Sequence, residues 1–158
     1  MTISETCLPS LIAPQKLLTF ERLDIAVKWR FFRHLQECDD PDSERIYRWH
    51  IEKRTGGQEP RSWKRSIDDY VTACKDLLES MLRSGFNQDF PLEYGNNGRL
   101  RSGAHRLACA LLLGLDVYYV ILMINGNTIW NEKWFVRHGM TPEDLERIKT
   151  DWAHLKMR

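Results

Sequence analysis

The sequence has no hydrophobic run long enough to span a membrane, and no basic segment followed by an apolar stretch opens it. These absences predict a chain without a membrane span or a secretory leader. An excess of one charge is also missing, because 23 Lys and Arg residues balance 22 Asp and Glu residues. A nearly neutral chain is not suited to following a phosphate backbone, so nonspecific nucleic-acid binding is not favoured.

Cysteine is scarce, and its spacing points to no metal site or disulfide framework. The four cysteines stand at Cys7, Cys38, Cys74 and Cys109, with no C-x-x-C pair and no Cys/His ligand pattern. Cys74 and Cys109 fall on apolar helix faces, where cysteine behaves as a small core residue. Reduced thiols favour a cytoplasmic protein. Repeats, low-complexity tracts and internal linkers are absent as well, so residues 1–158 are predicted to form one domain.

Hydrophobic periodicity predicts an α+β fold in which several helices flank a small mixed sheet. Residues 1–16 carry two prolines and no periodicity, which predicts an extended N-terminal arm. Ser66-x-x-Asp69 is a capping box, and the helix that it opens should stop at Gly85. The Asn-Gly pair at 97–98 predicts a hairpin. Helices are expected at 21–37, 44–54, 66–84, 104–113, 130–138 and from 142 onward, and strands at 91–94, 99–101 and 117–124.

The stretch from Arg99 to Gly114 organises these expectations. It predicts a strand end, a tight turn at Gly103 and a helix that is apolar on every side from Leu107 to Leu113, and therefore buried. Such a helix opens with free N–H groups and the positive end of its dipole, which together favour an anion. The predicted anion site consists of Ser102, Gly103, Ala104, His105 and Arg106. In the alternative, His105 and Arg106 only tether the helix, for example to the Glu93 carboxylate.

Ser-Gly-Ala-His-Arg-Leu-Ala at 102–108 resembles the Gly-x-His-Arg box of the ParB/sulfiredoxin superfamily, in which the box binds nucleotide phosphates. Other segments resemble a small ParB-like branch that accompanies surface-glycan biosynthesis. They are Arg22-Leu23-Asp24 with Lys28-Trp29, the Tyr-x-x-His-Ile segment at 47–51, and Gly85-Phe86. The resemblance spans residues 17–120 and implies a ParB/sulfiredoxin-like fold.

The resemblance also suggests roles for Asp24, Lys28 and His50, which the hydrophobic pattern alone would assign to the protein core. Asp24 and Lys28 stand four apart on the apolar side of a predicted helix, which is the spacing of a self-neutralising ion pair. His50 projects from an apolar helix face, where a hydrogen-bonded core histidine is the commoner case. The resemblance instead implies that all three face a cleft. Asp24 would then be the catalytic base, Lys28 would neutralise charge or hold substrate, and His50 would be a second base or a substrate contact.

Within this superfamily, the residue types in and beside the box indicate which reactions are possible. Sulfinic acid reduction needs a cysteine in the box, where this chain has Ala104. The resemblance therefore implies a kinase that binds ATP or ADP with Mg²⁺ and phosphorylates a hydroxyl of a sugar or polyol. The related free serine kinases carry an acidic residue where this chain has Ser102, so a base or metal ligand must come from elsewhere. The serine at position 102 favours an alternative function, that of a non-catalytic nucleotide-sensing or protein-binding module. A nucleic-acid-associated regulator is the third alternative.

Overall fold

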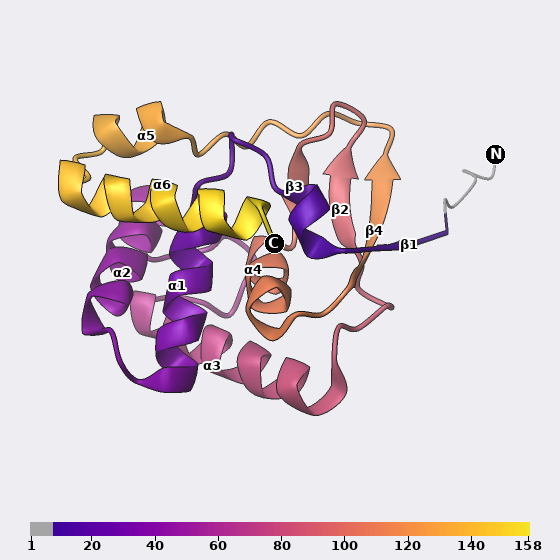
Figure 1. Ribbon diagram of the computed structural model, residues 1–158, viewed down its shortest axis with the longest axis horizontal. Helices are drawn as coiled ribbons and strands as arrows, with labels where there is room; N and C mark the ends of the chain where they lie inside the picture. The colour runs from indigo at the N-terminus through magenta and orange to yellow at the C-terminus, as the bar shows by residue number, and fades with distance from the viewer. Residues whose placement is uncertain (1–7) are drawn as a thin grey trace.

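The computed structural model describes residues 8–158. In this part of the chain, helices gather on one side and a four-stranded sheet lies on the other, with α4 between them (Figure 1). The fold class is α+β, as predicted. In chain order, the elements are β1 (Ser10–Ile12), the 3₁₀ helix η1 (Pro14–Leu17), α1 (Asp24–Glu37), α2 (Pro41–Thr55), α3 (Ile67–Ser84), β2 (Leu92–Gly95), β3 (Leu100–Ser102), α4 (Ala104–Leu113), β4 (Val117–Leu122), α5 (Glu132–Arg137) and α6 (Pro142–Lys156).

The sheet has the order β1-β4-β2-β3. β2 pairs in parallel with β4, in the register Leu92 to Tyr119, and antiparallel with β3. A parallel pair needs a crossover connection, and here β3 and α4 together provide it. The crossover therefore joins β2 to β4, and β3, which is antiparallel to both, lies at the edge of the sheet. β1 adds the remaining strand, antiparallel to β4.

α4 is the buried centre of the fold, as its sequence predicted. Five of its residues, from Leu107 to Leu111, are at most 2% exposed, and the helix packs against α1, α3 and β2. Glycines with positive φ flank it, Gly103 before its first residue and Gly114 after its last. The two thiols assigned to the core, Cys74 and Cys109, are buried and free.

Several predicted boundaries are wrong, and local contacts explain the differences. In the predicted extended arm, residues 10–12 are extended and pair with β4, but Pro14 opens a 3₁₀ turn that was not predicted. Residues 1–7 lie outside the described part. α1 begins at Asp24 rather than at residue 21, because the backbone at Arg22 forms a bridge with Trp130. α2 begins at Pro41 instead of residue 44, since proline fits the first helical position.

The other helix signals agree with the structure. Ser66 and Asp69 form the capping box at the start of α3, with both side-chain-to-backbone bonds present, and Gly85 ends the helix. Thr141 caps α6. Among residues 8–158, no helix combines the length and the apolar composition needed to cross a membrane.

Candidate functional site: a basic cavity at the start of α4

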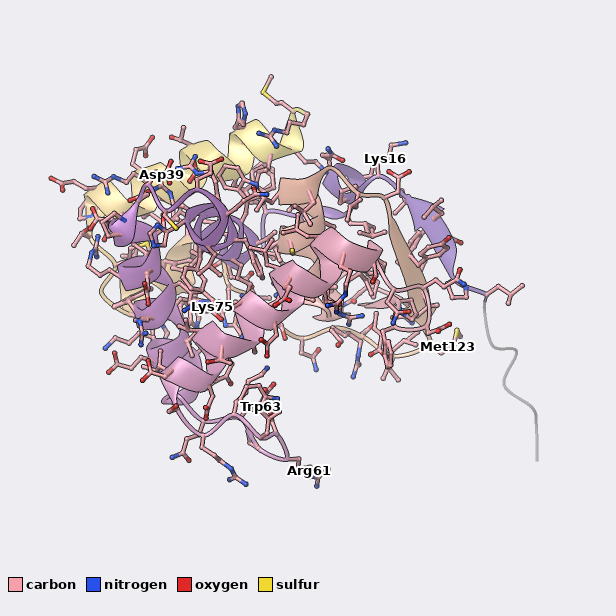
Figure 2. The ribbon with its side chains drawn as sticks, turned by 90° about the horizontal axis from the view of Figure 1, so that it is seen from below. Lys16, Asp39, Arg61, Trp63, Lys75 and Met123 are labelled. Atoms are coloured by element: carbon pink, nitrogen blue, oxygen red, sulfur yellow. The ribbon has the colours of Figure 1, made fainter. Side chains whose placement is uncertain are left out.

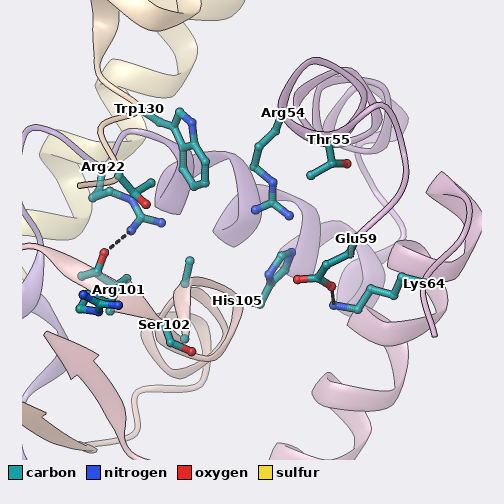
Figure 3. A pocket seen from close by; sticks show the side chains of 13 residues that line it. Arg22, Arg54, Thr55, Glu59, Lys64, Arg101, Ser102, His105 and Trp130 are labelled. Carbon is teal, nitrogen blue, oxygen red and sulfur yellow. Dashed lines mark hydrogen bonds and ion pairs between the residues drawn. The ribbon is translucent and has the colours of Figure 1, made fainter. Parts of the chain in front are cut away.

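A cavity of about 370 Å³ opens where the end of α2, the α2–α3 loop, β3 and the start of α4 meet (Figure 3). Residues from segments far apart in sequence line it. They are Arg22, Arg54, Thr55, Glu59, Lys64, Leu100, Arg101, Ser102, Gly103, Ala104, His105, Thr128 and Trp130. Four of the five residues predicted to bind an anion, those at 102–105, are among them.

The turn at Gly103 gives the cavity its backbone donors. Gly103 has a φ of +104°, and a Cβ at this position would overlap the buried Leu92 side chain. Only glycine therefore fits here without strain. The first amide bonded within α4 is that of Leu107, which donates to the Gly103 carbonyl at 2.9 Å. The preceding N–H groups have no backbone acceptor in the described chain, and they are available to an anion.

Arg106 does not join this set. Its guanidinium donates to the Phe90 carbonyl and, at 3.5 Å, to the Pro91 carbonyl. Arg106 is also not among the residues that line the cavity. The tethering alternative therefore describes Arg106, although its partners are two carbonyl oxygens and not the Glu93 carboxylate.

Asp24 and Lys28 form a buried ion pair behind the cavity. The Lys28 Nζ atom lies 2.5 Å from the Asp24 Oδ2 atom, and both side chains are 0% exposed. Arg22 completes the cluster with two bonds to the same carboxylate, at 2.7 and 2.9 Å. Neither Asp24 nor Lys28 lines the cavity, whereas Arg22 does. This arrangement is the one that the ion-pair alternative describes.

The charges of this cluster make Asp24 a poor proton acceptor. Burial by itself would raise the pKa of Asp24, but the charges of Arg22 and Lys28 outweigh burial and hold this pKa well below its usual range. Burial lowers the pKa of Lys28 to about 7, although Asp24 opposes the change. A carboxylate that is sealed from solvent and held ionised by two cations serves to hold those cations in place.

His50 is enclosed by aromatic rings and is separated from the cavity. It is 0% exposed, and neither ring nitrogen has a hydrogen-bond partner among residues 8–158. The ring stacks on Phe135 and meets Trp130 and Trp134 edge-on. Burial lowers the pKa of His50 well below its usual range, and the Lys28 charge lowers it further. His50 is therefore a neutral core residue in this structure, and the core alternative describes it.

His105, in contrast, reaches the cavity and is held from behind. Its Nε2 atom lies 2.8 Å from the Tyr47 hydroxyl, which lies 3.2 Å from the Cys74 Sγ atom. Burial lowers the pKa of His105 well below its usual range, and the positive charges of Lys28, Arg54 and Lys64 act in the same direction. The imidazole is consequently neutral at physiological pH.

Five charged cavity residues were not predicted as site residues from the sequence: Arg22, Arg54, Glu59, Lys64 and Arg101. Arg54 ends α2, and Arg101 lies in β3 beside the predicted turn. Glu59 and Lys64 come from the α2–α3 loop and pair at 3.0 Å. Figure 2 shows this loop at the margin of the molecule, with Arg61 and Trp63 at its tip. The two adjacent glycines at 56–57, where this loop begins, were the available sequence signal.

The cavity keeps a positive charge after its internal ion pairs are counted. Arg22 is neutralised by Asp24, and Lys64 by Glu59. Arg54 and Arg101 have no carboxylate partner among the described residues. The Arg54 guanidinium lies over Trp130, 5.2 Å from the ring centroid, and its Nε atom is buried without an acceptor. Arg101 also donates one hydrogen bond to the Asn125 carbonyl, at 2.8 Å. Two guanidinium groups without a carboxylate partner, next to the N-terminus of a helix, are suited to binding an anion.

Metal ligands are sparse here. The described residues contain no group of three or more His, Cys, Asp or Glu side chains arranged to hold a metal ion. Glu59 is the one carboxylate among the residues that line the cavity. Mg²⁺ commonly binds through one or two carboxylates together with substrate phosphates and water. Glu59 is already paired with Lys64, so the cavity lining offers no unpaired carboxylate to a metal ion.

Comparisons of the chain with protein-family models, with curated proteins and with solved structures found no match. Membership of the ParB/sulfiredoxin superfamily therefore stays a prediction from the Gly-x-His-Arg box.

Proposed function

We propose that this protein binds the phosphate groups of a nucleotide, ATP or ADP, in the cavity at the start of α4. The observation that carries the proposal is the convergence of Arg54, Arg101, the open N–H groups of α4 and the neutral His105 on one cavity. Charge-assisted hydrogen bonds of this kind are about twice as strong as neutral ones. The volume of about 370 Å³ also lies within the usual range for small-molecule sites.

Calorimetric titration with ATP, ADP and pyrophosphate, with and without Mg²⁺, tests this proposal. We expect binding by the wild type, and an affinity lower by about tenfold to a hundredfold in Arg101→Met, because a hydrogen bond between charged groups contributes about 1.5–3 kcal/mol. Arg83→Met is the control, since Arg83 is exposed on α3 and pairs only with Glu79 at 4.0 Å. An absence of heat with every ligand at millimolar concentration would contradict the proposal.

A second candidate function, phosphoryl transfer to a hydroxyl of a sugar or polyol, is favoured by Glu59. Burial would raise the pKa of Glu59, but its bond to Lys64 and the charge of that residue lower it, so the carboxylate is ionised at neutral pH. The acceptor oxygen would bond to the terminal phosphorus as the bond to the departing nucleotide oxygen breaks. The hydroxyl proton would pass to Glu59. Surface-glycan biosynthesis is the setting that the family resemblance suggests.

Glu59→Gln separates transfer from binding. Turnover of ATP with a panel of sugars and polyols should fall by roughly 10²–10⁴, the usual contribution of acid–base catalysis. Nucleotide affinity should stay close to the wild-type value, because the amide removes a negative charge from a site for anions. Asp68→Asn, on the exposed start of α3, is the matched control. If the wild type binds nucleotide and transfers phosphate to none of the acceptors, the binding-module alternative is supported instead.

A further inference from the structure

We propose that Tyr47 fixes the tautomer of His105, so that the imidazole presents an Nδ1–H donor to the cavity and the site selects ligand oxygens that only accept hydrogen bonds. This inference rests on the proposed binding of phosphate. It adds a positioning residue that lies outside the cavity, and it specifies the class of ligand atom that His105 contacts, an ionised phosphate oxygen.

Geometry places the two residues in one hydrogen bond. The Tyr47 hydroxyl and the His105 Nε2 atom are 2.8 Å apart. Tyr47 is 0% exposed, and its ring stacks on Phe31 with centroids 4.3 Å apart, so the hydroxyl cannot move far. His105 is the second residue of α4, and the hydrogen bond of its ring to Tyr47 runs through Nε2, which leaves Nδ1 for a ligand. Nδ1 is also the ring nitrogen nearer the main chain, where the open N–H groups of α4 lie.

The direction of the bond follows from the third member, Cys74. The Tyr47 oxygen has two neighbours, the Cys74 sulfur at 3.2 Å and the imidazole nitrogen at 2.8 Å. Its single proton goes to the nitrogen, because thiol sulfur is a weak acceptor. The Cys74 S–H group can then donate to the Tyr47 oxygen. With Nε2 occupied as an acceptor, the proton of the neutral ring resides on Nδ1.

The three hydrogen-bonded side chains, His105, Tyr47 and Cys74, stay un-ionised near pH 7. Burial raises the pKa of Tyr47 above its usual value and that of Cys74 to about 11. The cations that face His105 from the other elements are Lys28, Arg54 and Lys64, with Asp24 opposing them, and together with burial they disfavour imidazolium. The proton on Nδ1 therefore depends on Tyr47. An isolated neutral histidine favours the opposite tautomer, whose Nδ1 lone pair would repel an anion.

Nitrogen-15 NMR of the ligand-free protein tests the tautomer directly. In the wild type, long-range ¹H–¹⁵N correlations should identify His105 as the Nδ1–H tautomer. In Tyr47→Phe, which keeps the ring stacked on Phe31, the correlations should change to the Nε2–H tautomer or to a mixture. Cys74→Ala is the control, because it removes the S–H group and leaves the Tyr47 donor in place. An Nε2–H tautomer in the wild type would overturn the inference, whether or not the protein binds phosphate.

Pyrophosphate affinity gives the second readout. Tyr47→Phe should weaken binding by about tenfold, while Cys74→Ala should remain within about twofold of the wild type. Two substitutions of His105 discriminate further, since the Asn amide nitrogen can occupy the place of Nδ1 and the Gln amide nitrogen that of Nε2. His105→Asn should retain more affinity than His105→Gln. An equal loss of pyrophosphate affinity in both variants would overturn the inference. Failure of the wild type to bind pyrophosphate would contradict only the proposed function, and the NMR result would then decide the tautomer.

Discussion

Replacing Asp24 with Asn is expected to lower the free energy of unfolding by about 3–5 kcal/mol, the usual cost of removing one partner of a buried ion pair. Asp24 holds two cations, Arg22 and Lys28, and all three side chains are at most 5% exposed. The amide would leave the Arg22 charge without a counter-charge in a region of low dielectric constant, and it would remove the carboxylate that favours the protonated form of Lys28. Chemical denaturation followed by circular dichroism measures the loss.

The double variant Asp24→Leu with Lys28→Met is the control. It removes the closest pair together, and replacing a buried pair by apolar groups is often neutral or even stabilising. Much of the lost stability should therefore return, although Arg22 keeps only its bond to the Leu100 carbonyl at 3.1 Å and its contact with the Trp130 ring, 4.9 Å from the centroid. The family resemblance implies a different result for Asp24→Asn, with folding nearly intact and phosphoryl transfer reduced by roughly 10²–10⁴. Wild-type stability combined with lost turnover would assign Asp24 to catalysis.

Arg54→Met should have opposite effects on binding and on stability. Nucleotide affinity should fall by about tenfold to a hundredfold, because an unpaired guanidinium leaves the cavity. The melting temperature should stay constant or rise by about 2–4 °C, which corresponds to about 1 kcal/mol for a domain of this size. Calorimetric titration and thermal unfolding measure the two effects on the same samples.

The reason for the opposite signs is that Arg54 is unfavourably placed in the free protein. Its Nε atom is buried without an acceptor, a defect that costs about 1–3 kcal/mol. The Arg54 guanidinium stacks on the rings of Trp130 and Tyr70, 5.2 and 5.7 Å from their centroids, which offsets about 0.5–2 kcal/mol of this cost. Binding sites commonly retain such strain for function. Arg48→Met, on the same helix, is the matched control and should leave affinity unchanged, since Arg48 pairs with Glu44 and Asp68. A large loss of stability in Arg54→Met would show that Arg54 is part of the scaffold.

The predicted site residues other than Arg106 fall into two groups, according to whether they line the cavity. Ser102, Gly103, Ala104 and His105 lie at the cavity, where an anion can reach them. Asp24, Lys28 and His50 lie behind it and are fully buried. The second group supports the cavity wall, since the Asp24 carboxylate orients the Arg22 guanidinium that lines it. Any reaction in the proposed site would therefore use groups at the cavity surface, of which Glu59 is the one carboxylate.

The sequence by itself determined the features that depend on neighbouring residues. A capping box acts over three residues, and the Asp24–Lys28 pair acts over four, so the chain order contains both partners. Gly103 and Gly114 bound α4 because each permits a positive φ at low cost. The continuous apolar run in α4 likewise predicted a buried helix, because no polar face remains to meet water.

Only the tertiary structure decided which of these residues meet in one site. Arg54, Glu59 and Arg101 belong to three segments, and no local sequence pattern indicates that they are neighbours. They lie in one cavity because α2 and the α2–α3 loop pack against the start of α4. Tyr47 and His105 are 58 residues apart, and their bond depends on the same packing. Burial has the same origin. Helical periodicity showed that Asp24 and His50 lie on apolar faces, but packing of distant segments determines that neither reaches the cavity: α4 packs against α1, and Trp130, Trp134 and Phe135 surround His50.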